Sequence, residues 1–225
     1  MSERRIFRQS RYAVPPGSTE ILLVRHGESE AYVEGENVAK IDGHDDPPLA
    51  RAGQIQAEHL AERLCGERID AIYVTNLRRT AETAAPLVAR LGLRPSVVPE
   101  LREVHMGEWE GGTFRQRLAD GDPLLEQMRA EERWDVIPGA ETRDGFRSRV
   151  RAGIEKIAAA HPDQRVVAVT HAGTIATIVS IATGSRPFAF LGANNGSITA
   201  LVVSGDAWQV RSFNDAAHLR GVVLP

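Results

Sequence analysis

The chain has 225 residues and a formal net charge of -3, with 42% hydrophobic and 25% charged residues. This size and balance are typical of one main globular domain with a sizeable core, which excludes a chain that is disordered throughout. The mild acidity, with a sequence pI near 6.2, gives the molecule as a whole no electrostatic reason to bind nucleic acid or an anionic membrane, so we expect neither partner.

Residues 1–17 are basic, lack hydrophobic periodicity and end in Pro15-Pro16-Gly17. We therefore predict a flexible N-terminal arm, followed by a single domain over 18–225. The first residues contain no apolar core of a secretory leader, and no apolar run is long enough to cross a bilayer. These features predict a cytoplasmic location.

The remaining chain alternates between short apolar runs and amphipathic segments. Strands buried on both faces are predicted from the apolar runs at 20–25, 69–75 and 165–170, with a shorter strand at 96–98. Apolar spacings near three and four predict helices at 50–67, 79–91, 142–160 and 173–182. Two final strands, at 197–203 and 208–212, are joined across Gly205-Asp206 as a hairpin.

This order of elements predicts an α/β fold. We expect a three-layer sandwich with a mostly parallel central sheet, helices on both faces and an antiparallel edge. The edge hairpin offers one surface for a homodimer. The single cysteine, Cys65, falls on the apolar side of the predicted helix at 50–67, so we predict a core thiol rather than a disulfide or a zinc ligand.

The stretch at 111–143 differs from the rest of the chain. Its apolar periodicity is weak, and Gly111-Gly112, Gly121, Pro123 and Pro138-Gly139 interrupt it. We predict a partly helical insertion here, and it is a candidate lid.

Two histidines follow buried strands. His26 comes directly after the strand at 20–25, and His171 comes directly after the strand at 165–170. Ligands of parallel sheets bind beyond the carboxyl ends of the strands, and the glycine or alanine that follows each histidine lets the backbone approach a ligand. A lone histidine at a strand end is more often structural than catalytic, so the pair favours a site more than either member does.

Further ionisable residues follow the other strands. Arg78 and Arg79 come just after the strand at 69–75, and a guanidinium matches two phosphate oxygens at once. An arginine at a helix start is usually a solvated charge, and Arg78 fits that interpretation. Glu103, Glu108 and Glu110 precede the insertion; one of them could act as an acid, but spacing alone does not choose among them.

Together these segments resemble the histidine phosphatase superfamily, also called the phosphoglycerate mutase-like family. The motifs that carry the resemblance are Arg25-His26-Gly27-Glu28-Ser29, Leu77-x-Arg79, Leu101-x-Glu103 with Gly107-x-Trp109-Glu110-Gly111, and Thr170-His171-Ala172-Gly173. They follow the family's order over residues 20–213, and four ordered motifs are specific. One departure is that Glu30-Ala31-Tyr32 stands where members often carry an Asn or Trp-Asn.

The resemblance implies a phosphomonoester hydrolase that moves a phosphoryl group from a small phosphorylated substrate to a histidine and then to water, with no metal or other cofactor. It makes His26 the nucleophile and Glu103 the general acid. A protonated His171 would donate a hydrogen bond to the phosphoryl group. The implied catalytic residues are His26, Glu103, Arg25, Arg79 and His171. The implied substrate-binding residues are Arg25, Ser29, Arg79, His171 and Ala172.

Two alternatives to a phosphatase stay open. A cofactor-dependent phosphoglycerate mutase would return the phosphoryl group to a second oxygen of the substrate, but such mutases usually carry His-Gly-Asn and a longer insertion. This chain has His171-Ala172-Gly173 and a shorter insertion, which favours the phosphatase. A non-catalytic module that binds phosphorylated ligands is the second alternative, and retention of all five implied catalytic residues argues against it.

Overall fold

A six-stranded sheet forms the centre of the protein in the computed structural model, which describes residues 7–225; residues 1–6 of the predicted arm lie outside the described residues. The strands lie in the order β5 (Ser96–Val97), β4 (Ala71–Val74), β6 (Arg165–Thr170), β1 (Thr19–Arg25), β7 (Ile198–Ser204) and β8 (Ala207–Asp215). β5, β4, β6 and β1 are parallel, whereas β7 and β8 form an antiparallel hairpin at the edge.

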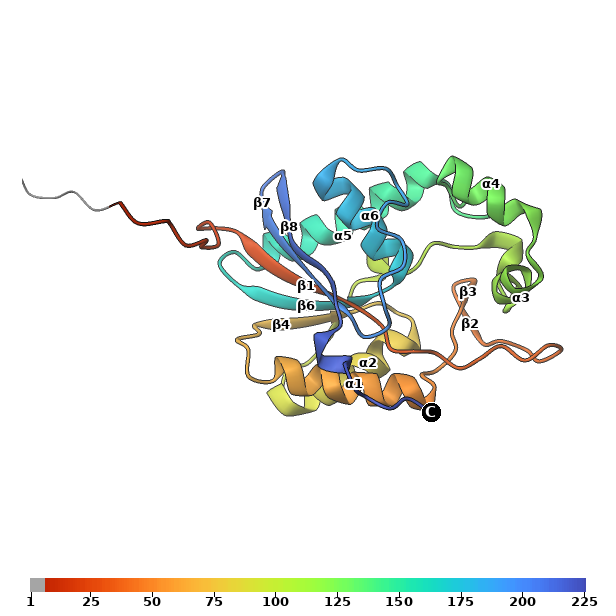
Figure 1. The fold of residues 1–225 in the computed structure, drawn as a ribbon, viewed down its shortest axis with the longest axis horizontal. Coiled ribbons are helices and arrows are strands. Elements are labelled where there is room, and N and C mark those ends of the chain that lie inside the picture. Colours follow the sequence, from red (N-terminus) through yellow and green to blue (C-terminus); the bar gives the residue numbers. More distant parts are fainter. Residues whose placement is uncertain (1–6) are drawn as a thin grey trace, which may run out of the picture.

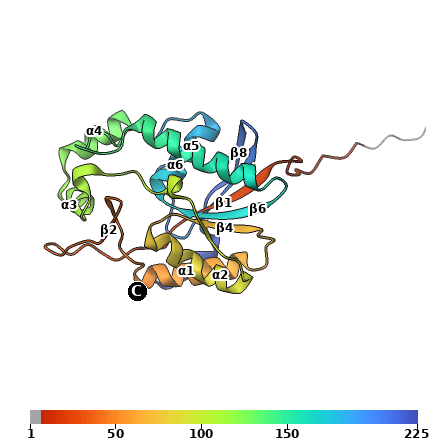
Figure 2. The same cartoon turned by 180° about the vertical axis from the view of Figure 1, so that it is seen from behind.

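Helices cover both faces of the sheet (Figures 1 and 2). α1 (Arg51–Leu64) and α2 (Arg78–Leu91) lie on one face, and α5 (Arg143–Ala160) and α6 (Ala172–Thr183) lie on the other. Successive side chains of a strand point to opposite faces. In β1, Ile21 and Leu23 therefore join the core beneath α5 and α6, while Leu22 and Val24 join the core beneath α1 and α2. The predicted three-layer α/β sandwich is confirmed.

The predicted thiol position is wrong. Cys65 is exposed: it is the C-cap of α1, whose last residue is Leu64, and it does not join the buried face of that helix. The Cys65 thiol lies 3.4 Å from the backbone oxygen of Glu62. Apolar spacing predicted the helix but extended it three residues too far.

The insertion and the loop before α1 both lie beyond the edge of the sheet at which β1 and β6 end (Figure 1). The insertion contains two short helices, α3 (Thr113–Asp120) and α4 (Pro123–Glu131). The loop before α1 contains a small hairpin, β2 (Lys40–Ile41) and β3 (His44–Asp45), which the sequence did not predict because two-residue strands have no readable periodicity. Within residues 7–225, three short 3-10 helices complete the elements: Pro99–Leu101, Gly107–Trp109 and Ala217–Leu219.

Residues 7–17 of the predicted arm are exposed and contain no helix or strand. Tyr12 nevertheless contacts the edge strand β8: its ring lies 3.4 Å from the guanidinium carbon of Arg211, and its hydroxyl donates to Gln209 Oε1 at 3.1 Å. The flexibility of the arm and the homodimer stay predictions. Within residues 7–225, no helix combines the length and apolar character needed to cross a membrane.

Candidate active site

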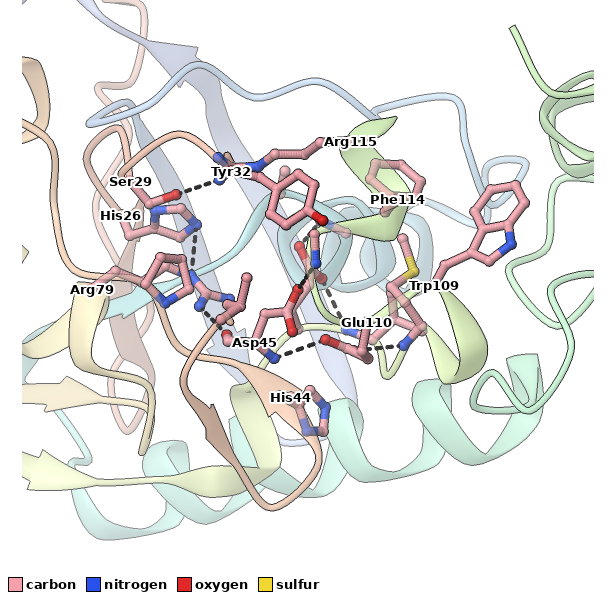
Figure 3. Close-up of a pocket in the computed structure, with 18 of the residues that line it drawn as sticks. His26, Ser29, Tyr32, His44, Asp45, Arg79, Trp109, Glu110, Phe114 and Arg115 are labelled. Atoms are coloured by element: carbon pink, nitrogen blue, oxygen red, sulfur yellow. Dashed lines mark hydrogen bonds between the residues drawn. The ribbon is translucent and has the colours of Figure 1, made fainter. Parts of the chain in front are cut away.

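A pocket with a volume of about 600 Å³ opens at the carboxyl ends of the central strands (Figure 3). Segments that are far apart in the chain supply its walls. The predicted site residues that line it are Arg25, His26, Ser29, Arg79, Glu103 and Ala172. His171 is fully buried beside it, with its ring centroid 5.1 Å from that of His26.

Hydrogen bonds fix the amide, the carbonyl and one ring nitrogen of His26. Its amide donates to Thr170 O at 2.9 Å, which joins it to the end of β6, and its carbonyl accepts from Asn195 Nδ2 at 2.9 Å. The ring nitrogen Nδ1 lies 2.7 Å from Gly27 O. A carbonyl can only accept a hydrogen bond, so Nδ1 carries the proton and the lone pair of the neutral ring belongs to Nε2.

The charge state of His26 follows from its surroundings. Burial holds the pKa of His26 well below its usual 6.5, and the neighbouring charges of Arg79 and Arg25 lower it further. The neutral Nε2 accepts from Arg79 Nε at 3.3 Å. The structure thus presents an unprotonated imidazole whose lone pair faces a guanidinium.

The glycine after His26 serves a different purpose from the one predicted. A Cβ on Gly27 would lie 2.6 Å from Gly53 O, and a Cβ on Gly53 would lie 2.0 Å from Glu28 O. Both glycines are therefore needed because the loop after β1 packs backbone to backbone on the start of α1, rather than on a ligand. The amide of Gly27 also donates to Thr83 Oγ1 of α2 at 2.9 Å, so both helices of this face anchor the loop.

The two predicted arginines reach the pocket from different elements, Arg25 from the end of β1 and Arg79 from α2. Arg79, on the first turn of α2, is only 8% exposed and donates to Asp45 O at 2.7 Å as well as to His26. Arg25 donates to Ala193 O at 2.6 Å, and its buried Nε has no partner. Burial lowers the pKa of both guanidinium groups, yet an arginine stays charged near neutral pH. Arg78 faces solvent and pairs with Glu82, as predicted.

The charge of His171 in the substrate-free protein follows from its burial. Burial, followed by the charge of Arg79, holds the pKa of His171 well below 6.5, so the substrate-free ring is neutral rather than protonated. Its Nε2 lies 3.2 Å from Thr75 Oγ1, and its Nδ1 is buried without a hydrogen-bond partner.

The structure removes one of the three candidate acids that spacing could not distinguish. Glu103 lines the pocket at the N-terminus of α6, where its carboxylate accepts from the amides of Gly173 at 3.0 Å and Thr174 at 3.1 Å. Glu110 also lines the pocket, and its two oxygens accept from the amides of Asp45 and Met106. Glu108 is exposed and does not line the pocket.

Glu103 is also fixed from behind by α5. Arg149 donates to the carbonyls of Glu103, Arg102 and Glu100, each at 2.8 Å, and forms an ion pair with Glu141 at 2.7 Å. Four partners on one guanidinium leave the loop before the insertion little freedom. The side chain of Glu103 is therefore presented to the pocket by a braced backbone.

Arg115 is a third guanidinium in the pocket that the sequence did not reveal. It lies on α3 and donates to Ser29 Oγ at 2.7 Å and to Glu30 O at 2.6 Å. Its charge contributes to the lowered pKa of His26. No sequence signal could have found it, because the weak periodicity of the insertion gave no face to α3 and no way to relate it to Ser29.

The small β2–β3 hairpin joins the insertion to Arg79. The carboxylate of Asp45 accepts from the amides of Gly111 at 2.6 Å and Gly112 at 2.8 Å, while its carbonyl accepts from Arg79. Burial, together with the nearby Asp45 carboxylate, raises the pKa of Glu110. One residue thus connects the start of α3 with the pocket's most buried guanidinium.

No metal-binding cluster is apparent in the described part of the chain. Residues 7–225 contain no group of three or more His, Cys, Asp or Glu side chains arranged to hold a metal ion. The absence of a cofactor therefore stays a prediction of the sequence.

The fold and the site define an α/β protein with an arginine-lined pocket beside paired histidines at the carboxyl edge of its sheet. The profile of the histidine phosphatase superfamily (branch 1) matches residues 21–216. The chain belongs to this superfamily.

Related sequences and structures extend this assignment. The chain is 33% identical over 204 residues to phosphoglycerate mutase-like protein 4 of Arabidopsis thaliana, covering 89% of this chain and 86% of the relative. It is 33% identical over 210 residues to the metal-independent phosphoserine phosphatase of the same plant, covering 91% and 84%. Among solved structures, mycobacterial glucosyl-3-phosphoglycerate phosphatase in complex with VO3 matches with a TM-score of 0.73 and 30% identity, over 88% of this chain and 99% of that one.

Proposed function

We propose that the protein is a metal-independent phosphomonoester hydrolase that acts on a small phosphorylated metabolite through a phosphohistidine at His26. The observation that carries this proposal is the neutral ring of His26 in the wall of the pocket, whose Nδ1 is fixed by Gly27 O and whose Nε2 keeps its lone pair. The relatives named as phosphatases, one of them metal-independent, support the same activity.

The first step is attack of His26 Nε2 on phosphorus. The N–P bond forms as the bond from phosphorus to the leaving oxygen breaks, and Glu103 delivers a proton to that oxygen. Arg79 Nε, which bonds His26 Nε2 in the substrate-free protein, is released to donate to a phosphoryl oxygen. The positive charges of Arg25 and Arg115 offset the negative charge on the phosphoryl oxygens, which stabilises the transition state without a metal.

The second step is hydrolysis of the phosphohistidine. Water attacks phosphorus, the N–P bond breaks, and the Glu103 carboxylate takes the proton of the water. The buried Nδ1 of His171 has no protein partner, and a phosphoryl oxygen would supply one. The bound phosphate dianion would also raise the pKa of His171, which favours the protonated donor that the sequence predicted.

The test is to trap the phosphoenzyme. The wild type is mixed with a radiolabelled phosphomonoester in the presence of excess chelator and is then quenched rapidly without acid. We expect the labelled protein to carry a phosphohistidine, which is labile in acid and stable in base. His26→Ala should give no labelled protein and should lower kcat by on the order of 10⁴-fold or more while keeping a wild-type circular dichroism spectrum. Labelling of a folded His26→Ala protein at the wild-type level would refute the proposed nucleophile.

A phosphoglycerate mutase is the second candidate, because one relative is named phosphoglycerate mutase-like protein 4. Incubation with 3-phosphoglycerate distinguishes the two activities. A phosphatase releases inorganic phosphate, whereas a mutase produces 2-phosphoglycerate faster than it releases phosphate.

A further inference from the structure

The pocket has a second half that the proposed chemistry does not use. Aromatic rings from the insertion and its flanks contact one another in a chain: Trp109 with Phe114 at 6.1 Å between centroids, and Phe114 with Trp134 at 6.4 Å. All three line the pocket, as does Tyr32. We call these four residues the aromatic half, and Figure 3 shows Tyr32, Phe114 and Trp109 across the pocket from His26 and Arg79.

Two rings of the aromatic half, those of Trp109 and Trp134, pack against the hydrophobic core. Trp109 is 4% exposed and Trp134 is 8% exposed, so each ring is packed from behind and offers only part of its surface to the pocket. Trp134 is further supported by Phe188, at 4.9 Å between centroids. Rigid rings lose little conformational entropy when a ligand binds against them, so this wall is suited to contact with a ligand.

Cationic groups gather at the other half. The lysine and arginine side chains that line the pocket within residues 7–225 are Arg25, Arg79 and Arg115, and all three contribute to the electrostatic environment of His26. His44 lines the pocket too, but burial lowers its pKa to about 4, so it is neutral at pH 7. Of the three arginines, Arg115 lies beside the aromatic half, next to Phe114 in the chain, but its guanidinium already donates to Ser29 Oγ and Glu30 O (Figure 3). A carboxylate on the leaving group would have to compete for it.

The pocket carboxylates are equally unsuited to an ammonium group. Asp45, Glu103 and Glu110 are each held by two or more backbone amides. Glu28 and Glu30 are exposed, so their charges are solvated by water. The polar partners that a phosphorylated amino acid needs beyond its phosphate are therefore already engaged or in solvent.

We propose that the site takes phosphomonoesters whose leaving alcohol carries an aromatic ring or a comparable apolar body, in preference to phosphorylated amino acids and glycerates. This inference rests on the proposed function. The phosphoryl group binds between the arginines around His26, and the body of the alcohol lies against Phe114 and the other rings of the aromatic half. The volume of about 600 Å³ is in the range of pockets that enclose a small organic ligand in addition to a phosphate.

The experiment compares alcohols of similar acidity, so that leaving-group chemistry does not differ. Phosphate release is measured for 2-phenylethyl phosphate, ethyl phosphate, O-phosphoserine and 3-phosphoglycerate. We expect kcat/KM for 2-phenylethyl phosphate to exceed that for each of the others by about 10- to 100-fold.

Substitutions then assign the preference to the aromatic half. Phe114→Ala should lower the 2-phenylethyl to ethyl ratio of kcat/KM about tenfold, chiefly through KM, and Phe114→Leu should keep part of it. Leu118→Ala is the matched control on the same helix, because Leu118 is 48% exposed and does not line the pocket. It should leave the ratio at the wild-type value.

The outcomes separate this inference from the function on which it rests. A 2-phenylethyl to ethyl ratio near one, or a higher kcat/KM for phosphoserine or phosphoglycerate, would overturn the aromatic preference while hydrolysis itself stands. An unchanged ratio in Phe114→Ala would also overturn it. If the wild type hydrolyses none of the four substrates faster than His26→Ala, both the proposed function and the preference are wrong.

Discussion

The two halves of the pocket are held in place by different interactions. His26 and His171 follow β1 and β6, whose parallel register pairs Arg25 with Thr170, so the backbone ladder of the sheet fixes the phosphate-binding half. In the aromatic half, Trp109 and Trp134 belong to the core, whereas Phe114 lies on α3, which has no buried residue and is also attached through polar contacts such as those of Arg115. This difference teaches that changes at the strand ends should affect every substrate, whereas changes in the insertion can select among substrates.

Among the substitutions that compare the two halves, the largest effect is expected at Arg79. Arg79→Ala removes a donor to the phosphoryl oxygens, so kcat/KM should fall by about 10²- to 10³-fold for every phosphomonoester, measured by phosphate release. Arg78→Ala is the matched control, because Arg78 faces solvent and pairs with Glu82. A loss confined to aromatic substrates would place Arg79 in the wrong half of the pocket.

The packing beneath His26 should matter next. A Cβ at Gly53 would meet Glu28 O at 2.0 Å, so Gly53→Ala should lower the free energy of unfolding by about 2 to 3 kcal/mol in urea. Gly66→Ala is the control, because nothing lies within 4 Å of its added Cβ, and its effect should stay within about 0.5 kcal/mol. Equal effects at the two glycines would argue against the tight contact between the His26 loop and α1.

Arg115 tests whether the two halves are separate. It lies on the insertion but donates to Ser29, so Arg115→Gln should lower kcat/KM about tenfold for ethyl and 2-phenylethyl phosphate alike. Arg117→Gln, on the same helix, removes only an ion pair with Asp122 and serves as the control. If Arg115→Gln impairs only the aromatic ester, Arg115 belongs functionally to the aromatic half.

The smallest effect is a pH dependence of stability from the phosphate-binding half. Burial holds the pKa of His171 well below 6.5 in the folded protein. Near pH 6 the imidazole is therefore protonated in most unfolded chains but stays neutral in the folded protein. The free energy of unfolding should therefore fall by about 0.7 kcal/mol per such histidine between pH 7 and pH 6. In urea titrations, the free energy of unfolding of His171→Asn should fall by that much less than that of the wild type. A change equal to that of the partly exposed His59→Asn control would contradict the neutral ring.

Sequence patterns predicted the sheet and the residues at its strand ends. The apolar run at 165–170 matches β6 at both ends, and the pairs His26 with His171 and Arg25 with Arg79 come together because parallel strands place their carboxyl ends at one edge. These residues carry a signal since each follows a strand with clear periodicity. Spacing did not choose among the three glutamates, and the choice of Glu103 came from the family resemblance; the structure adds that Glu103 accepts from amides at the start of α6.

The contacts of the insertion could not be predicted. Arg115 reaches Ser29 across 86 residues, and neither position shows a pattern that relates it to the other. Asp45 lies in a two-residue strand, too short for periodicity, yet its carboxylate binds the amides that begin α3. Polar contacts between irregular segments depend on distances in space that local sequence does not encode.

The pairing of β1 with β6 also has a kinetic consequence. These adjacent central strands are joined by contacts such as Glu20 with Arg165, which are 145 residues apart in the chain. A loop of that length must close before His26 and His171 can meet, and such non-local pairing is slow compared with helix formation. During refolding, catalytic competence should therefore return later than helical circular dichroism, so recovered activity reports completion of the central sheet.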